Sequence, residues 1–331
     1  MNNIYSRKVG GKSLKNNLNK SLKIIGNIIT IVAIFYVIKR LMNNDYDYSQ
    51  LLVSKNIFPM LIIIVVQSVM VMTNAFPWKI LVEMLTERKV PFVETIPVYV
   101  SANLMKYVPG NVFQYVGRNQ LAVRNRLPHL PVALATMLDV LITVIAAAII
   151  SIFFLYDFIA KYLRVNSWMQ TALIIVGIII VLAVFLMFLF RNQIWKKIEN
   201  YSYLFSTKSI KTILVALIYY IIVLMISSLM YLIVVIYITD TPLSSQVFLQ
   251  LFSAYTLAWL VGFITPGAPG GIGIKELVMV AVTGGYIGTD VITLSMVIIR
   301  ILLVVADCIA FVFGKIFEII YKTKGRQNAS N

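Results

Sequence analysis

The segment at residues 264–278, ITPGAPGGIGIKELV, combines proline, glycine and charge within an otherwise apolar stretch. Proline lacks the N–H that a helix interior needs, so the prolines should end the preceding helix. Glycine tolerates positive φ and lets backbone N–H groups approach a ligand closely. A helix expected from Ile272 onward would point its unpaired amides and positive dipole end at an anion. The candidate anion site therefore consists of Pro266, Gly270, Gly271, Gly273, Lys275 and Glu276.

A second segment, SANLMKYVPGNVFQYVGRNQLAVR at residues 101–124, repeats this chemistry with different residues. Pro109 and Gly110 are expected to form a turn, and the asparagine after them is suited to cap the next helix. Lys106 precedes the turn, and Arg118 lies within the helix that follows. Each segment thus provides a cation, a Pro–Gly turn and a helix N-terminus, which together can hold a phosphate group.

Three further charged residues, Asp139, Arg300 and Asp307, lie inside apolar segments. A charge at the centre of a membrane helix costs about 2.5–3.5 kcal/mol, so such residues are expected to face the protein interior and find partners. Arg300 and Asp307 are separated by about two helical turns, roughly 10 Å along the axis, which is too far for a direct ion pair.

The two broken segments supply the expected partners for these charges. We expect Asp139 to pair with Lys106 or Arg118. For the last apolar segment, which carries Arg300 and Asp307, the expected partners are Lys275 and Glu276. Two interpretations stay open, because the pairs either belong to a binding site or only fasten the broken segments to the spans.

The surroundings of these residues are those of an integral membrane protein. Of 331 residues, 60% are hydrophobic and 13% charged, with a mean hydropathy of +0.87, whereas soluble domains contain about 45–50% apolar residues. A span needs about 20 mostly apolar residues. The expected full spans are residues 24–42, 57–76, 131–154, 168–190, 212–238 and 291–313.

The distribution of Lys and Arg between short loops predicts how the chain is threaded. If the broken segment at 95–122 crossed the membrane fully, the five cations of the 191–211 loop would lie outside. If that segment and the one at 247–286 instead return to the side they entered from, the cation-rich loops and both termini lie in the cytoplasm. The sequence therefore predicts an all-α polytopic fold of six spans and two oppositely oriented re-entrant hairpins, the pattern of an inverted repeat.

This threading defines the expected domain organisation. Residues 1–23 form a basic cytoplasmic N-terminus, residues 24–317 a single transmembrane domain, and residues 318–331 a short basic cytoplasmic tail. The net charge of +16 is explained by topology and by attraction to anionic lipid headgroups. No nucleic-acid motif accompanies it. With one cysteine, Cys308, and one histidine, His129, the chain suggests no disulfide, no metal site and no cofactor.

Two stretches, KYVPGNVFQYVGR and TPGAPGGIGIKE, resemble the lysylphosphatidylglycerol synthase transmembrane-region family of flippase-like membrane proteins. The resemblance covers roughly residues 24–317, and its most specific part is the Pro-Gly-Gly-Ile-Gly-x-x-Glu run. It implies movement of a lipid between leaflets, the lipid carrying a positively charged headgroup or a linked sugar. The synthases of that family carry a soluble transferase domain that this chain lacks, so lysyl transfer is not expected and the resemblance is to stand-alone members.

The expected function is therefore binding and translocation of a lipid in cell-envelope biogenesis, at the plasma membrane of a bacterium. Expected partners are anionic phospholipids, aminoacylated lipids or polyprenyl-linked sugars, together with envelope-synthesis enzymes; a homo-oligomer is neither required nor excluded. The alternative is a non-transporting membrane partner of an envelope glycosyltransferase or lipid-modifying enzyme. Catalysis is not expected, because the outer loops are short and no helix carries the several aspartates that bind the metal of a phosphatidyltransferase.

Overall fold

The computed structural model describes residues 54–107, 113–125, 127–165, 206–265 and 269–330, and these contain helices and no strands. The helices are α2 (Ser54–Thr73), α3 (Ala75–Thr86), α4 (Phe92–Asn103), η2 (Leu104–Tyr107), α5 (Phe113–Arg124), α6 (His129–Val165), α9 (Thr207–Ile233), η4 (Val234–Ile238), α10 (Ser245–Ile264), η5 (Pro269–Gly271), α11 (Ile274–Thr283) and α12 (Thr289–Ser330).

Five helical stretches in the described part of the chain are long and apolar enough to cross a membrane: Lys55–Thr86, His129–Phe153, Thr207–Ile238, Ser245–Ile264 and Thr289–Tyr321. Four of them contain or nearly contain the expected spans at 57–76, 131–154, 212–238 and 291–313. The expected spans at 24–42 and 168–190 lie outside the described residues. The protein is a helical, multi-pass membrane protein.

The fifth stretch is α10, which falls within the broken segment at 247–286. Its 20 residues are as long as a span, whereas α11 has 10 and α4 and α5 have 12 each. A helix rises 1.5 Å per residue, so the three shorter helices reach about 15–18 Å and cannot cross about 30 Å of hydrocarbon. Each short helix instead packs beside its chain neighbour, α4 with α5 and α10 with α11.

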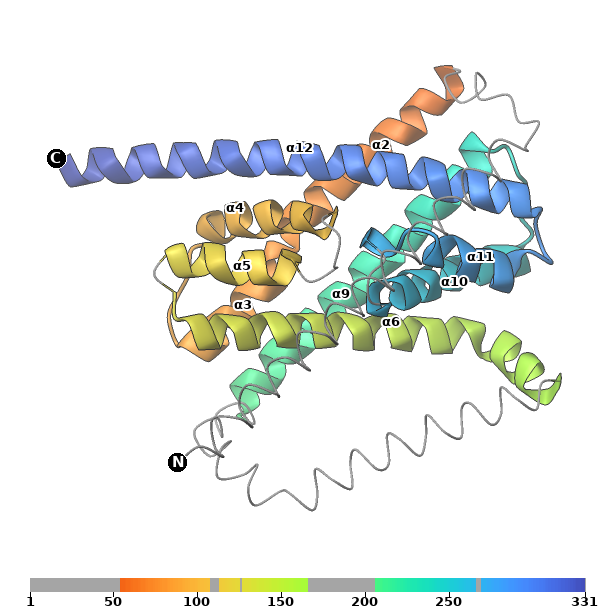
Figure 1. Cartoon of the computed structure of the whole chain (residues 1–331), viewed down its shortest axis with the longest axis horizontal. Coiled ribbons are helices and arrows are strands. Elements are labelled where there is room, and N and C mark those ends of the chain that lie inside the picture. Colours follow the sequence, from red (N-terminus) through yellow and green to blue (C-terminus); the bar gives the residue numbers. More distant parts are fainter. Residues whose placement is uncertain (1–53, 108–112, 126, 166–205, 266–268, 331) are drawn as a thin grey trace, which may run out of the picture.

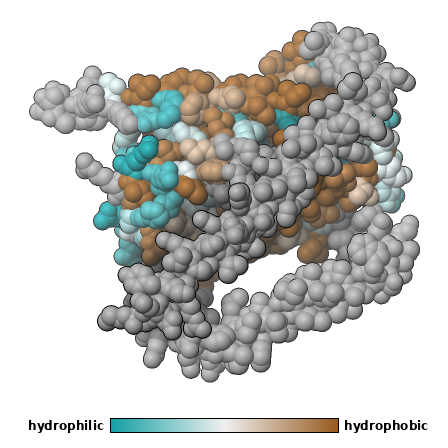
Figure 2. Space-filling model, viewed as in Figure 1, coloured by the Kyte–Doolittle hydropathy of each residue, from teal (hydrophilic) through white to brown (hydrophobic). Residues whose placement is uncertain are grey.

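These two helix pairs, which we call the first hairpin (α4, η2 and α5) and the second hairpin (α10, η5 and α11), lie between the long helices α6 and α12 (Figure 1). Helix α12 packs on α4, and α6 packs on α10. The hairpins point toward each other from opposite ends of the bundle, and their tips meet where η2 contacts η5. The middle of the visible, described surface is mainly apolar, with hydrophilic residues gathered toward its left and right margins (Figure 2).

Polar contacts between buried side chains join the long helices. Ser68 of α2 donates to the backbone oxygen of Ala306 in α12 at 3.1 Å. The Tyr231 and Ser295 hydroxyls, on α9 and α12, lie 3.0 Å apart. Trp78 of α3 is fully buried and donates its ring N–H to Thr136 of α6 at 3.0 Å. Hydrogen bonds of this kind hold membrane helices together where lipid supplies no hydrophobic drive for association.

The tail expected at residues 318–331 is helical as far as residue 330 and continues α12. One helix start differs from the expectation. The helix expected from Ile272 begins at Ile274, because Gly270, Gly271 and Gly273 all have positive φ, between 60° and 79°. That backbone direction is left-handed and cannot belong to a regular α-helix.

Candidate functional site

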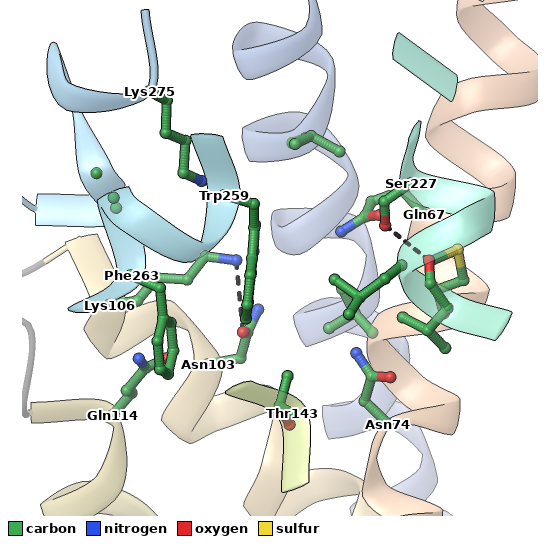
Figure 3. Close-up of a pocket in the computed structure, with 18 of the residues that line it drawn as sticks. Gln67, Asn74, Asn103, Lys106, Gln114, Thr143, Ser227, Trp259, Phe263 and Lys275 are labelled. Atoms are coloured by element: carbon green, nitrogen blue, oxygen red, sulfur yellow. Dashed lines mark hydrogen bonds between the residues drawn. The ribbon is translucent and has the colours of Figure 1, made fainter. Parts of the chain in front are cut away.

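A cavity of about 320 Å³ lies where the two hairpin tips meet. Its walls come from both hairpins and from four long elements, α2, α6, α9 and α12. This volume lies at the lower end of the range of small-molecule sites, about 300–1,000 Å³. Figure 3 shows Lys106 of the first hairpin and Lys275 of the second extending into this space beside Trp259.

The cavity brings together the cations that the sequence singled out. Lys106, Arg118, Lys275 and Arg300 all line it. Lys106 and Arg118 belong to the first hairpin, Lys275 to the second and Arg300 to α12. Four cations around one cavity repel one another strongly unless carboxylates or a bound anion compensate them.

Arg118 has the carboxylate partner that was expected for it. Its guanidinium donates to Asp139 Oδ2 at 2.6 Å, and Tyr220 of α9 donates to the other oxygen of Asp139. The guanidinium also lies 4.1 Å from the ring centre of Tyr99, a cation–π arrangement. Both charged residues are only 3% exposed, so this pair fastens α5 to α6 and α9.

Asp307 has a different partner from the one expected. It pairs with Lys106 at 2.6 Å and accepts hydrogen bonds from Asn103, at 2.9 Å, and from Tyr107. The expectation of Lys275 or Glu276 was wrong because α12 packs along both hairpins. Two helical turns after Arg300, the helix has left the second hairpin and reached the tip of the first.

Glu276 fixes the start of α11. Its Oε1 lies 2.6 Å from Arg300 Nη1, and its Oε2 accepts the backbone N–H of Gly273 at 2.8 Å. The side chain is 1% exposed and lies behind the cavity wall, which Arg300 lines in its place. The expected link between Glu276 and the last span is therefore present, and it positions Arg300 and the second hairpin.

Lys275 stands apart from the other three cations. Among the described residues it makes neither an ion pair nor a hydrogen bond. Its stem runs between two glycines: a Cβ on Gly262 would lie 2.8 Å from Lys275 Cγ, and a Cβ on Gly271 would lie 2.8 Å from Lys275 Cε. Any side chain at either position would displace the lysine. Because Gly262 and Gly271 have no side chains, the lysine stem can pass between them and bring its ammonium group to the cavity.

The rest of the wall is aromatic and polar without charge. Trp259 and Phe263 of α10 stack with ring centres 4.8 Å apart, and Tyr115 of the first hairpin meets Phe263 edge-on at 6.4 Å. The uncharged polar residues on the wall include Gln67, Asn74, Asn103, Gln114, Thr143 and Ser227. Ring faces and amide groups of this kind suit the polar part of an amphipathic ligand.

Several of these residues were not among the candidates chosen from the sequence. Trp259 and Phe263 are four residues apart, so they share a helix face, but that spacing is as common in cores as in sites. Nothing in the sequence pointed to Gly262, whose role becomes visible only from its contact with the Lys275 stem. Of the candidates, Gly270 and Gly271 line the cavity. Pro109, Gly110 and Pro266 lie outside the described residues.

The chain matches no protein-family model and no curated protein. These comparisons therefore contribute nothing to the inference of function.

The Arg118–Asp139 pair leads to a stability prediction. Asp139→Asn should lower the free energy of unfolding by about 3–5 kcal/mol, because it leaves the buried Arg118 charge without a carboxylate. Arg118→Met combined with Asp139→Leu should recover most of that loss, because no buried charge then remains. The measurement is reversible unfolding of the purified protein in mixed micelles.

The matched control is Glu318→Gln, which removes a carboxylate from a partly exposed pair with Lys315. Its cost should be about 0–1 kcal/mol. A double variant as unstable as Asp139→Asn, or more so, would contradict this account of the pair.

Proposed function

We propose that the protein binds an anionic lipid headgroup in the cavity between the hairpin tips and carries it between the leaflets. The observation that carries the proposal is Lys275, a cation that lines the cavity between the hairpins and pairs with no carboxylate among the described residues. A charge inside a membrane domain is costly unless something compensates it. An anion that enters and leaves the cavity supplies that compensation.

We further propose the membrane arrangement of six spans and two re-entrant hairpins. The contacts of the two halves support an inverted repeat, since α12 packs on α4 as α6 packs on α10, and α5 packs on α6 as α11 packs on α12. Each half also has an ion pair between its hairpin and the long helix that follows it. In one half the cation is on the hairpin and the acid on the span, Arg118 with Asp139, and in the other the signs are reversed, Glu276 with Arg300.

In this arrangement the acyl chains of the lipid stay in the bilayer while the headgroup occupies the cavity. The meeting of η2 with η5 separates the two ends of the bundle, so passage needs the hairpin tips to part. Lys106 reaches from the first tip to Asp307 on α12, and that pair is suited to hold the tip closed. Irregular backbone at membrane depth is tolerated at such a place because it lines a cavity instead of facing lipid.

We place the protein in the plasma membrane with both termini in the cytoplasm, because this orientation puts most Lys and Arg of the short loops inside. The resemblance of the KYVPGNVFQYVGR and TPGAPGGIGIKE stretches to the lysylphosphatidylglycerol synthase transmembrane region supports the flippase-like proposal. The driving force is then a gradient, a membrane potential or consumption of the lipid after transfer, since the sequence has no motif for binding ATP.

Lys275→Met tests the proposal in vesicles that contain the purified protein and a labelled lipid. The lipids are phosphatidylglycerol, its lysyl derivative and a polyprenyl-phosphate sugar. The wild type should exchange one of them between leaflets, and the variant should be slower by about tenfold or more, equivalent to at least about 1.4 kcal/mol of lost interaction.

The control for this test is Lys315→Met, which removes a cation of α12 that pairs with Glu318 and does not line the cavity. It should exchange the lipid as the wild type does. If a folded wild type exchanges none of the three lipids, the carrier proposal is wrong and the alternative of a non-transporting membrane partner is favoured.

Gly270 and Gly271 offer a second test with a built-in comparison. Both have positive φ, so alanine is strained at either position by about 1–2 kcal/mol. A Cβ at Gly270 meets nothing within 4 Å, whereas one at Gly271 meets Lys275 Cε at 2.8 Å and the Gly262 backbone, beside which the Lys275 stem runs, at 3.1 Å. Gly271→Ala should therefore slow lipid exchange by about tenfold more than Gly270→Ala does. Equal slowing by the two variants would show that the path of Lys275 does not matter.

A further inference from the structure

The cations that line the cavity outnumber the carboxylates that pair with them by one. Four cations line it, Lys106, Arg118, Lys275 and Arg300. Three carboxylates pair with three of them, Asp307 with Lys106, Asp139 with Arg118 and Glu276 with Arg300. Four positive charges less three negative charges leave one, and that charge is on Lys275.

The three carboxylates are not free to move to Lys275. Each uses one oxygen for its cation, and each makes further hydrogen bonds to the protein. Asp139 accepts from Tyr220, Asp307 from Asn103 and Tyr107, and Glu276 from the Gly273 N–H. The three paired cations are not available to a ligand either. If a ligand drew one of them away, its carboxylate partner would be left buried without a counterion, which is costly. The cavity therefore offers a ligand one positive charge.

The remaining wall restricts the uncharged part of the ligand. In the described chain, Gln67, Asn74, Gln114, Thr143 and Ser227 line the cavity and carry donors and acceptors without charge. Trp259 adds a ring face to the wall beside Lys106 (Figure 3). Apart from the paired Asp139, the wall carries no acidic side chain among the described residues, so an ammonium group on the ligand would have no free carboxylate.

From these two features we propose that the cavity selects a lipid with a single negative charge, a phosphodiester whose headgroup is otherwise neutral and bears hydroxyl groups. The phosphodiester contacts Lys275, and the hydroxyl groups contact the amides and Trp259. A phosphomonoester carries about −1.5 to −2 charges near neutral pH and leaves an uncompensated negative charge. A headgroup with an added ammonium cancels the charge that Lys275 recognises. This inference deepens the proposed function and rests on it for the position of the lipid.

The test is retention of lipid by the purified full-length protein, measured by native mass spectrometry. The protein is offered an equal mixture of phosphatidylglycerol, phosphatidic acid and phosphatidylcholine with identical acyl chains. The wild type should retain phosphatidylglycerol over each of the others by on the order of tenfold, because a mismatched charge in such a site is strongly disfavoured. This comparison needs no variant, so it does not depend on how any substitution folds.

Charge variants then shift the preference in opposite directions. Lys275→Met, which removes the remaining charge, should abolish the preference for phosphatidylglycerol. Glu276→Gln keeps an acceptor for the Gly273 N–H but frees the Arg300 charge, so the cavity offers two charges and phosphatidic acid should gain on phosphatidylglycerol. Glu318→Gln makes the same change in net charge beside Lys315, away from the cavity, and should retain the wild-type order.

The outcomes separate this inference from the proposed transport. Retention that follows the charge series supports the inference even if no lipid crosses between leaflets, and in that case only the transport proposal fails. Equal retention of phosphatidylglycerol and phosphatidic acid by the wild type, or an unchanged order in Glu276→Gln, overturns the inference even where lipid exchange still depends on Lys275.

Discussion

A charge inside a membrane domain must be compensated within the protein, and this constraint shapes the whole arrangement around the cavity. Arg118, Lys106 and Arg300 each reach a carboxylate on another helix, and every such pair joins a hairpin to a long helix. Helices α4, α5 and α11 are too short to span the bilayer. The ion pairs, with packing on α6 and α12, therefore hold the hairpin tips where they meet. Lys275 is the cation that this network leaves over among the described residues.

The same pairs hold the irregular backbone at the two hairpin tips in place. The tip of the second hairpin turns through Gly270, Gly271 and Gly273, all with positive φ, and one of its N–H groups is capped by Glu276. The first tip is held by Asp307 through three neighbouring side chains, Asn103, Lys106 and Tyr107. The two tips are thus held by different contacts, and the cavity lies where they meet.

Much of this arrangement could be predicted from the sequence, and the parts that could were local. Because intramembrane charges need partners, the sequence offered Lys106 or Arg118 for Asp139, and Lys275 or Glu276 for the last span. The structure has Arg118 with Asp139 and Glu276 with Arg300. Proline and glycine in apolar segments predicted both hairpins. The contact between Asp307 and the first tip could not be predicted, because Tyr107 and Asp307 are 200 residues apart. The passage of Lys275 beside Gly262 could not be predicted either, because the need for glycine at position 262 follows from how α10 and α11 pack together.

The central claim is that a lipid phosphate compensates Lys275 in the cavity, and the position of a bound lipid tests it most directly. The measurement is an experimental structure of the protein in nanodiscs of phosphatidylglycerol. The account predicts phosphate density within hydrogen-bonding distance of Lys275 Nζ, about 2.7–3.2 Å, with the headgroup beside Trp259 and the acyl chains leaving toward the bilayer. Ordered lipid confined to the outer surface of the helices, with Lys275 paired to a protein carboxylate, would contradict it.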